Sequence, residues 1–248
     1  YNNKLFSKLF LKYFLTNKLD KFTDISNAYS FIIYKKKSKI IIIGSDHMSL
    51  KQSFHMFKEK SFIISSRLSF ISIPFSSNLT LNEKRVRDFL NFSIKSRSYT
   101  FFNEIKKLAP RTILEFNRNN HALSARKYIN LLKIKRNKKM KTSTASNNFM
   151  HYISSNIRSA VSKRKKIGVL FSGGLDSSSI LKISSETKNT DQQLFSFSAT
   201  YSSLGTKIDE SKFQDSVINE IENITPLKFD GSKYSSIDNI DFYLDQIG

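Results

Sequence analysis

Residues 165–180, KKIGVLFSGGLDSSSI, place a short apolar run, a glycine pair and a cluster of hydroxyls in direct succession. The run from Ile167 to Phe171 is typical of a buried strand, and helical spacing begins directly behind the glycines. Gly173 and Gly174 carry no Cβ, so backbone N–H groups there can close on an anion. The stretch therefore predicts a strand, a tight loop and a helix, the repeating unit of an α/β fold.

The hydroxyls and the acid of this loop indicate phosphate binding. Ser172, Ser177 and Ser178 can donate to phosphate oxygens, and the helix N-terminus adds its positive dipole end. No Lys-Ser/Thr pair follows the glycines, which excludes the P-loop of nucleoside triphosphatases. Asp176 fits beside phosphates if it holds a magnesium ion. We interpret the loop as one that grips pyrophosphate while ATP is cleaved between its α and β phosphates. The alternative is a Ser/Gly-rich turn without a ligand.

The composition is that of a globular protein. The chain has 248 residues, 39% of them hydrophobic, with 22 Phe and no Trp, enough for one large or two ordinary domains. Because Cys is absent, disulfides, thiolate metal sites and a cysteine nucleophile are excluded within these residues. No apolar run reaches membrane-spanning length and no signal peptide opens the chain, so we expect a cytoplasmic protein without membrane contacts. The first residue is Tyr1, which suggests a piece of a longer protein.

The net charge of +21 raises the alternative of a nucleic-acid-binding module. Its densest basic cluster is KIKRNKKMK, from Lys133 to Lys141. The other lysines alternate with polar residues and form no stripe interleaved with aromatics. Lys, Asn, Ile, Phe and Ser are enriched together, as an AT-rich coding bias would produce. We therefore expect no specific nucleic-acid partner, and salt-sensitive binding at the cluster would be the sign of one.

The first half of the chain predicts a β-rich α+β unit. The runs 30–34 and 40–44 are joined by a lysine-rich turn, which predicts a hairpin, and 61–65 is a further short strand. Apolar spacing from Leu81 to Phe92 predicts a helix, with Asn78 and Thr80 as its start signals. A turn over 100–105 and a strand over 112–116 follow.

The second half predicts a parallel sheet. Residues 133–147 lose periodicity and become basic and then polar, which is typical of a linker. Helical spacing returns over 148–162, and the strand, loop and helix of the opening stretch follow. A strand over 193–201 and a helix over 209–222 come next. Strands separated by helical crossovers favour parallel pairing.

With these elements in place, the chain resembles the glutamine-hydrolysing asparagine synthetases. Besides the loop, the segment from Thr100 to Arg111 is similar to the family's TLF-x-x-I-x-x-L-x-PG stretch. Residues 45–49 stand where the family has Arg-Asp-x-x-Gly, and 65–67 where it has Ala-Ser-Glu. Tyr128 is similar to a Tyr of the family's following strand pair, and 208–211 to its Asp-Glu helix start.

The resemblance implies a fold class and a domain order. Residues 1–132 would be the later part of an N-terminal-nucleophile glutaminase, an αββα sandwich, and 133–147 a linker. Residues 148–248 would be the first part of a Rossmann-like ATP-pyrophosphatase domain with a parallel sheet. The family's nucleophilic Cys and its glutamine-binding acid would precede Tyr1, so no catalytic or glutamine-binding residue is expected within this chain. The implied small molecules are ATP, Mg²⁺, aspartate and glutamine, and the implied assembly is a homodimer.

Family positions carry roles over to particular residues. The ATP and pyrophosphate site would comprise Phe171, Ser172, Gly173, Gly174, Leu175, Asp176, Ser177, Ser178 and Ala199. Asp176 is also the expected Mg²⁺ ligand, and Phe171 and Ala199 would hold adenine at the ends of adjacent strands. We interpret Asp46 as a structural carboxylate that accepts N–H groups of its turn. Asp209 and Glu210 are expected to cap the following helix. The four histidines, His47, His55, His121 and His151, show no ligand spacing and receive no role.

Four departures from the family keep a second function open. Ser45 replaces the family's Arg, Ser49 its Gly, Gln52 its Pro and Arg67 its Glu. β-Lactam synthetases and lasso-peptide macrocyclases share the pyrophosphate loop but have a degenerate or inactive glutaminase half. The sequence therefore predicts ATP-dependent amide formation, by an asparagine synthetase or by such a cyclase.

Overall fold

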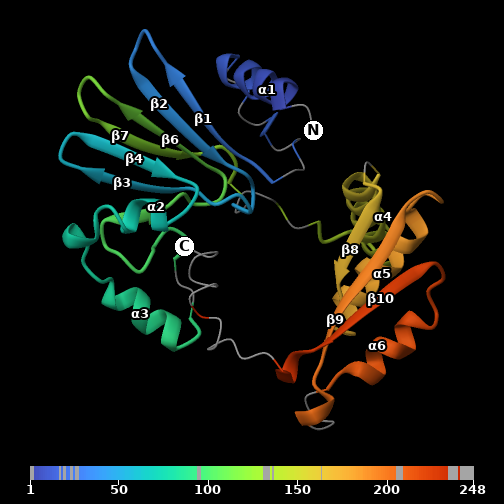
Figure 1. The fold of residues 1–248 in the computed structure, drawn as a ribbon. Helices are drawn as coiled ribbons and strands as arrows, with labels where there is room; N and C mark the ends of the chain where they lie inside the picture. The colour runs from blue at the N-terminus through green and yellow to red at the C-terminus, as the bar shows by residue number, and fades with distance from the viewer. Residues whose placement is uncertain are drawn as a thin grey trace. The chain divides into compact units, whose positions relative to one another are not determined.

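The computed structural model describes residues 3–16, 18, 21–22, 25, 28–93, 96–130, 135, 137–162, 164–204, 209–233 and 240 (Figure 1). The side chains of residues 3–6 and 10 are not included in this description. The described residues form two compact units, one within Tyr1–Lys135 and the other within Arg136–Ile240. Each unit is treated by itself below.

The first unit contains two antiparallel sheets. The first sheet has the order β1-β2-β6-β7 and the second the order β4-β3-β5. The strands are β1 (Ser30–Lys35), β2 (Ile40–Ser45), β3 (Phe54–Lys58), β4 (Ser61–Ser65), β5 (Ile105–Lys107), β6 (Thr112–Asn117) and β7 (Leu123–Lys127). The helices are α1 (Asn3–Leu15), α2 (Ser69–Ser72) and α3 (Glu83–Leu90). The predicted hairpin is formed by β1 and β2, with Ile32 paired with Ile43.

Three apolar clusters separate the layers of this unit. Successive side chains of a strand point to opposite faces of the sheet, so Ile42 and Ile43 of β2 enter different clusters. Ile42 packs with Phe14 of α1, whereas Ile43 packs with Leu114 of the same sheet and against the second sheet. The second sheet buries its other face against Ile71 of α2. The order helix, sheet, sheet, helix (Figure 1) is the αββα sandwich that the resemblance implied.

The turn after β2 is organised around a buried carboxylate. Asp46 is 3% exposed. Its Oδ1 accepts the N–H groups of Met48 at 2.9 Å and Leu50 at 3.1 Å. Its Oδ2 accepts those of Tyr29 at 3.1 Å and Lys51 at 3.2 Å. The prediction that Asp46 is a structural, turn-fixing residue is confirmed, since its lone pairs are spent on four backbone donors.

Ser49 and Arg111 are among the residues of this unit that have a left-handed backbone without being glycine. Ser49 has φ of 56° and Arg111 has φ of 61°. A side chain at such φ is disfavoured by contact between Cβ and the backbone. Compensating contacts hold both: Ser49 Oγ donates to Leu108 O at 3.1 Å, and Arg111 N donates to Asp46 O at 3.0 Å.

The second unit is built on a three-stranded parallel sheet of order β10-β9-β8. Its elements are α4 (Thr142–Val161), β8 (Lys166–Leu170), α5 (Leu175–Thr187), β9 (Gln193–Thr200), α6 (Ser211–Ile218) and β10 (Ile224–Asp230). Val169 of β8, Leu194 of β9 and Leu181 of α5 are buried together with Val161 of α4 and Ile221 after α6. The helical crossovers thus bury one face of the sheet, and the predicted α/β class is confirmed for this unit.

Several element boundaries differ from those predicted. The helix α3 begins at Glu83, and its cap is Asn82, whose Oδ1 accepts the N–H of Arg85 at 3.0 Å. Asn78 and Thr80 are therefore not its start signals, because their side chains bond to Lys58 and Glu104 instead. α4 begins at Thr142, within the stretch expected to be a linker, and α6 spans only Ser211–Ile218. Residues 133, 134 and 136 of the basic cluster and Ile208 lie outside the described residues.

Replacing Asp46 by Ala is expected to lower the melting temperature of the first unit. The change leaves four N–H groups without their carboxylate acceptor, and a hydrogen bond to a charged group contributes about 1.5–3 kcal/mol. The expected loss of unfolding free energy is of that size or larger, measured by thermal and urea unfolding of the full-length protein. Asp46→Asn keeps one carbonyl acceptor and should lose less. A normal melting temperature for Asp46→Ala would contradict the structural role of this carboxylate.

Candidate functional site

The predicted pyrophosphate loop lies between the end of β8 and the start of α5. β8 ends at Leu170, and the N–H of Phe171 still donates to Phe197 O of β9 at 2.8 Å. Residues 172–174 form the loop, and α5 begins at Leu175 with Gly174 as its cap residue. The loop therefore lies at the carboxyl ends of parallel strands and at a helix N-terminus, where open α/β sheets bind phosphate-bearing ligands.

Serine hydroxyls close the loop on itself. Ser172 Oγ and Ser177 Oγ are 3.2 Å apart, and Ser177 Oγ also donates to Gly174 O at 3.1 Å. Ser172 Oγ accepts the N–H of Gly174 at 3.3 Å. These contacts join the two ends of the loop across the first turn of α5. In this arrangement Ser177 donates its proton to Gly174 O and Ser172 donates its proton to Ser177 Oγ, so either hydroxyl would have to turn from its present partner to donate to a phosphate oxygen.

Gly173 is required by the loop in a way that Gly174 is not. Gly173 has φ of 89°, and an added Cβ would lie 3.1 Å from the backbone N of Gln214. Gly174 has φ of −73°, and its nearest neighbour would be Ser172 Oγ at 3.4 Å. A side chain at Gly173 is therefore strained and crowded against backbone, whereas Gly174 has the space and the conformation for one.

Gln214 of α6 holds the loop from behind and was not singled out by sequence reasoning. Its side chain is 1% exposed. Its Nε2 donates to Ala199 O at 3.0 Å and to Ser172 O at 3.4 Å, so one amide joins the end of β9 to the loop after β8. Its Oε1 is buried and has no hydrogen-bond partner among the described residues. A polar residue at a core position of an amphipathic helix was the available sequence signal.

The remaining loop residues differ in their exposure. Leu175 and Asp176 are exposed in the first turn of α5, and Asp176 makes no hydrogen bond or ion pair with the described residues. Its carboxylate is therefore available to a ligand. Ser178 Oγ, by contrast, is buried and has no hydrogen-bond partner in the described part of the chain. Ser178 needs only a rotamer change or a small ligand-induced shift to gain a partner.

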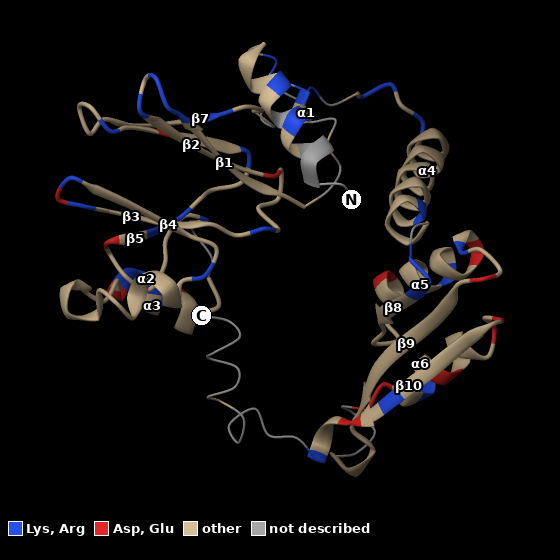
Figure 2. Cartoon of the chain, turned by 45° about the horizontal axis from the view of Figure 1, so that its top comes forward, with Lys and Arg blue, Asp and Glu red and all other residues tan. Residues whose placement is uncertain are grey.

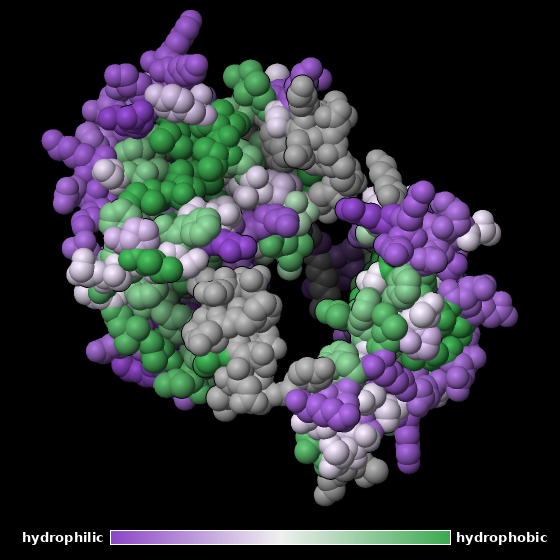
Figure 3. Space-filling view, in the orientation of Figure 1, coloured by the Kyte–Doolittle hydropathy of each residue, from purple (hydrophilic) through white to green (hydrophobic). Residues whose placement is uncertain are grey.

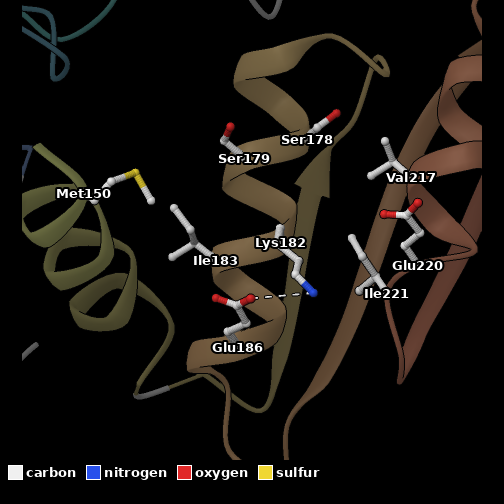
Figure 4. Close-up of a pocket in the computed structure, with 9 residues that line it drawn as sticks. All are labelled: Met150, Ser178, Ser179, Lys182, Ile183, Glu186, Val217, Glu220 and Ile221. Carbon is white, nitrogen blue, oxygen red and sulfur yellow. Dashed lines mark ion pairs between the residues drawn. The ribbon is translucent and has the colours of Figure 1, made fainter. Parts of the chain in front are cut away.

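A groove of about 420 Å³ runs from Ser178 along α5 (Figure 4). In Figure 4, Ser178 and Lys182 lie on the side of α5 that faces α6, and Ile183 points toward Met150 of α4. Lys182 is paired with Glu186 at 3.6 Å. Most of the groove lies along the helices, away from the strand ends, and only its Ser178 end adjoins the loop.

Phe171 directly follows the end of β8, and Ala199 lies near the end of the adjacent strand β9. Phe171 is 2% exposed and belongs to the core cluster of the unit. Its side chain is therefore occupied by packing, and any contact it makes with a nucleotide comes from the backbone. Ala199 is half-buried and its C=O is taken by Gln214.

The capping role expected of Glu210 is wrong, while Asp209 bonds to Ser211, the first residue of α6. Glu210 is the cap residue of α6, but its side chain makes no capping hydrogen bond. Asp209 instead accepts the hydroxyl of Ser211 at 2.6 Å and the N–H of Tyr201 at 2.9 Å. These bonds, with that of Ser211 first, lower the pKa of Asp209. The acid thus joins the chain that leaves β9 to the first residue of α6.

The histidines and the basic residues form no further catalytic cluster in the described residues. His47 Nδ1 lies 3.1 Å from Tyr128 Oη, and burial lowers the pKa of His55 to about 4, with Lys106 adding to the shift. Within the described ranges no three His, Asp or Glu side chains are grouped so as to hold a metal ion.

Figure 2 shows Lys and Arg spread over many elements of both units, and Figure 3 shows hydrophilic residues at the hairpin ends of the first unit. No described helix is long and apolar enough to cross a membrane.

Comparison with protein families finds one matching family for each unit. Residues 9–129 match the family described as glutamine amidotransferase domain, and residues 152–245 match that described as asparagine synthase. No curated protein matches the chain. The two matches occur in the order that the resemblance implied. Together they support membership of the family of glutamine-dependent amidotransferases and ATP-dependent ligases to which the asparagine synthetases belong.

Replacing Gly173 by Ala should damage the loop, while Gly174→Ala serves as the matched control. The loop holds position 173 in a left-handed conformation, which costs a residue with a Cβ about 1–2 kcal/mol. The added methyl would also meet the backbone of α6. We expect a lower melting temperature of the second unit and weaker ATP binding for Gly173→Ala, measured by thermal unfolding and nucleotide titration. Equal stability and equal ATP affinity of the two variants would show that the conformation of Gly173 is unimportant.

Proposed function

We propose that the protein is an asparagine synthetase, which forms an amide on the side chain of aspartate at the expense of ATP. The aspartate carboxylate attacks the α-phosphorus of ATP, so that the bond to the β-phosphate breaks and pyrophosphate leaves. Ammonia released from glutamine then attacks the aspartyl-AMP and expels AMP. The single observation that supports this reaction most is the closed loop at the carboxyl end of β8, with Gly173 in a left-handed conformation.

The loop would act by stabilising charge on the leaving pyrophosphate. The first N–H groups of α5 are donors fixed before the ligand arrives, and the hydroxyls of Ser172 and Ser177 would join them by turning from their partners within the loop. Donors that are already oriented need no reorganisation as charge develops, which is the main source of electrostatic catalysis. The bond from Gln214 to Ser172 O keeps the loop in register with the end of β9.

Asp176 is the residue that would hold Mg²⁺. It is an exposed acid in the first turn of α5. Magnesium in such enzymes is held by one or two carboxylates together with substrate phosphates, so a single acid at a phosphate-binding loop fits its requirements. When bound, the ion neutralises charge on the phosphate oxygens. The carboxylate would thus orient the polyphosphate rather than take part in proton transfer.

A second candidate is an amide-forming cyclase with an inactive glutaminase half. The observation in its favour is the place taken by Ser45. Where the family has Arg, this serine is fully buried, and its Oγ donates to Ala109 O at 2.7 Å. The serine is thus part of the turn packing and presents no charge to a ligand. Such a change is expected in a unit that keeps its fold without the family's glutamine chemistry.

Asp176→Asn tests the proposed ATP chemistry. In the full-length protein the substitution should abolish exchange between ATP and pyrophosphate in the presence of aspartate, because the neutral amide is a poor Mg²⁺ ligand. Hydrolysis of glutamine should be unchanged. Asp191→Asn, an exposed acid beyond the far end of α5, is the control and should exchange at the wild-type rate. Exchange by Asp176→Asn at near wild-type rate would rule out its role.

The source of nitrogen separates the two candidates. An asparagine synthetase should form asparagine from aspartate with either glutamine or ammonium as the donor, measured by amino-acid analysis. A cyclase should accept neither donor and should exchange pyrophosphate only with its own carboxylate substrate. Activity with ammonium but not with glutamine would show that the glutaminase unit alone has lost its reaction.

A further inference from the structure

The first unit contains a pocket that is separate from the residues discussed above as the nucleotide site. Its volume is about 370 Å³. The turn after β2, the start of α3, the segment 96–99 and the end of β5 form its walls. Its polar and charged lining consists of Ser49, Gln52, Arg85, Arg97, Tyr99 and Lys107, with Ser96 beside them.

The pocket has a strong excess of positive charge. Arg85, Arg97 and Lys107 line it, and no acidic residue does. None of the three forms an ion pair with an acid in the described residues. Asp88, one turn further along α3, is not part of the lining and has a partner of its own. Within the described residues, three cations therefore line one cavity that no carboxylate lines with them.

Burial makes this charge costly in the empty protein. Arg85 Nη1 is buried and has no hydrogen-bond partner among the described atoms. The pKa of Lys107 is lowered, first by burial and then by the charge of Arg85. Arg85 and Lys107 are half-buried and Arg97 is exposed, and the guanidinium of Arg85 also lies over the Phe101 ring, 5.7 Å from its centre. The unpaired N–H group of Arg85 and the like charge of Lys107 are nevertheless destabilising in a partly buried site. A bound anion would relieve both, so its binding energy would include the release of this repulsion.

The rest of the lining restricts the ligand. Guanidinium groups bind the oxygens of phosphates and carboxylates through paired N–H bonds. Leu50 and Met48 also line the pocket and are largely exposed, at 68% and 61%, so they offer apolar surface next to the cations. A cavity of this size holds a small molecule rather than a chain.

We infer that this pocket binds a small organic anion whose phosphate or carboxylate group lies between Arg85, Arg97 and Lys107. The site goes beyond the proposed synthesis of asparagine and does not depend on it, because its residues belong to the first unit alone.

The test is a calorimetric titration of the full-length protein at low ionic strength, once with inorganic phosphate and once with succinate. The wild type should bind at least one of the two probes, and which one binds tighter identifies the anionic group. Arg97→Gln combined with Lys107→Gln should weaken that binding at least tenfold. Arg87→Gln, which removes an exposed guanidinium of α3 outside the pocket, should bind as the wild type does.

Two controls keep the test decisive. Circular dichroism and thermal unfolding verify that the double variant is folded. Asp176→Asn should bind the probe normally, so failure of the proposed ATP chemistry would leave this result intact. No binding of either probe to the wild type, or equal affinity of the wild type and the folded double variant, would overturn the inference.

Discussion

The buried amide of Gln214 is the interaction on which the candidate nucleotide site depends. In a parallel sheet, a site at the carboxyl ends of the strands is formed largely by the loops that follow those strands. Loops are more mobile than the strands they connect, so they have to be held in place. Here a single side chain from α6 donates to Ala199 O on β9 and Ser172 O after β8. Gly173 packs directly against the backbone of the same residue. The loop is thus held by the second crossover helix as well as by its own hydroxyls.

The first unit uses a similar solution at a different turn. Asp46 collects four backbone N–H groups and so fixes the chain between β2 and β3. With the backbone held this way, Ser49 and Arg111 occupy left-handed conformations that suit glycine better. A buried acceptor or donor that bonds to several backbone groups lets the surrounding sequence change without loss of the fold. This explains how a unit can keep the glutaminase architecture while departing from the family at Ser45 and Ser49.

Sequence reasoning found the features that depend on local pattern. The hairpin of β1 and β2, the strand-loop-helix of β8 and α5, and the turn role of Asp46 all follow from residues close together in the chain. The prediction missed β10, because Pro226 interrupts its pattern and an edge strand tolerates a proline. It also missed the role of Gln214 and the bond of Asp209 to Tyr201, since both depend on backbone groups brought close by tertiary packing. The predicted start of α3 was wrong for the same reason, because the side chain of Thr80 bonds to Glu104 rather than to the backbone of α3.

The central claim is that the loop after β8 holds the pyrophosphate of ATP and not a transferred γ-phosphate. Phosphorus NMR of the products formed by the full-length protein with ATP, aspartate and ammonium tests it most directly. The account predicts AMP and pyrophosphate in equal amounts, with formation dependent on the acceptor carboxylate. Formation of ADP and inorganic phosphate would contradict it, because cleavage would then occur at a bond that the proposed loop does not activate.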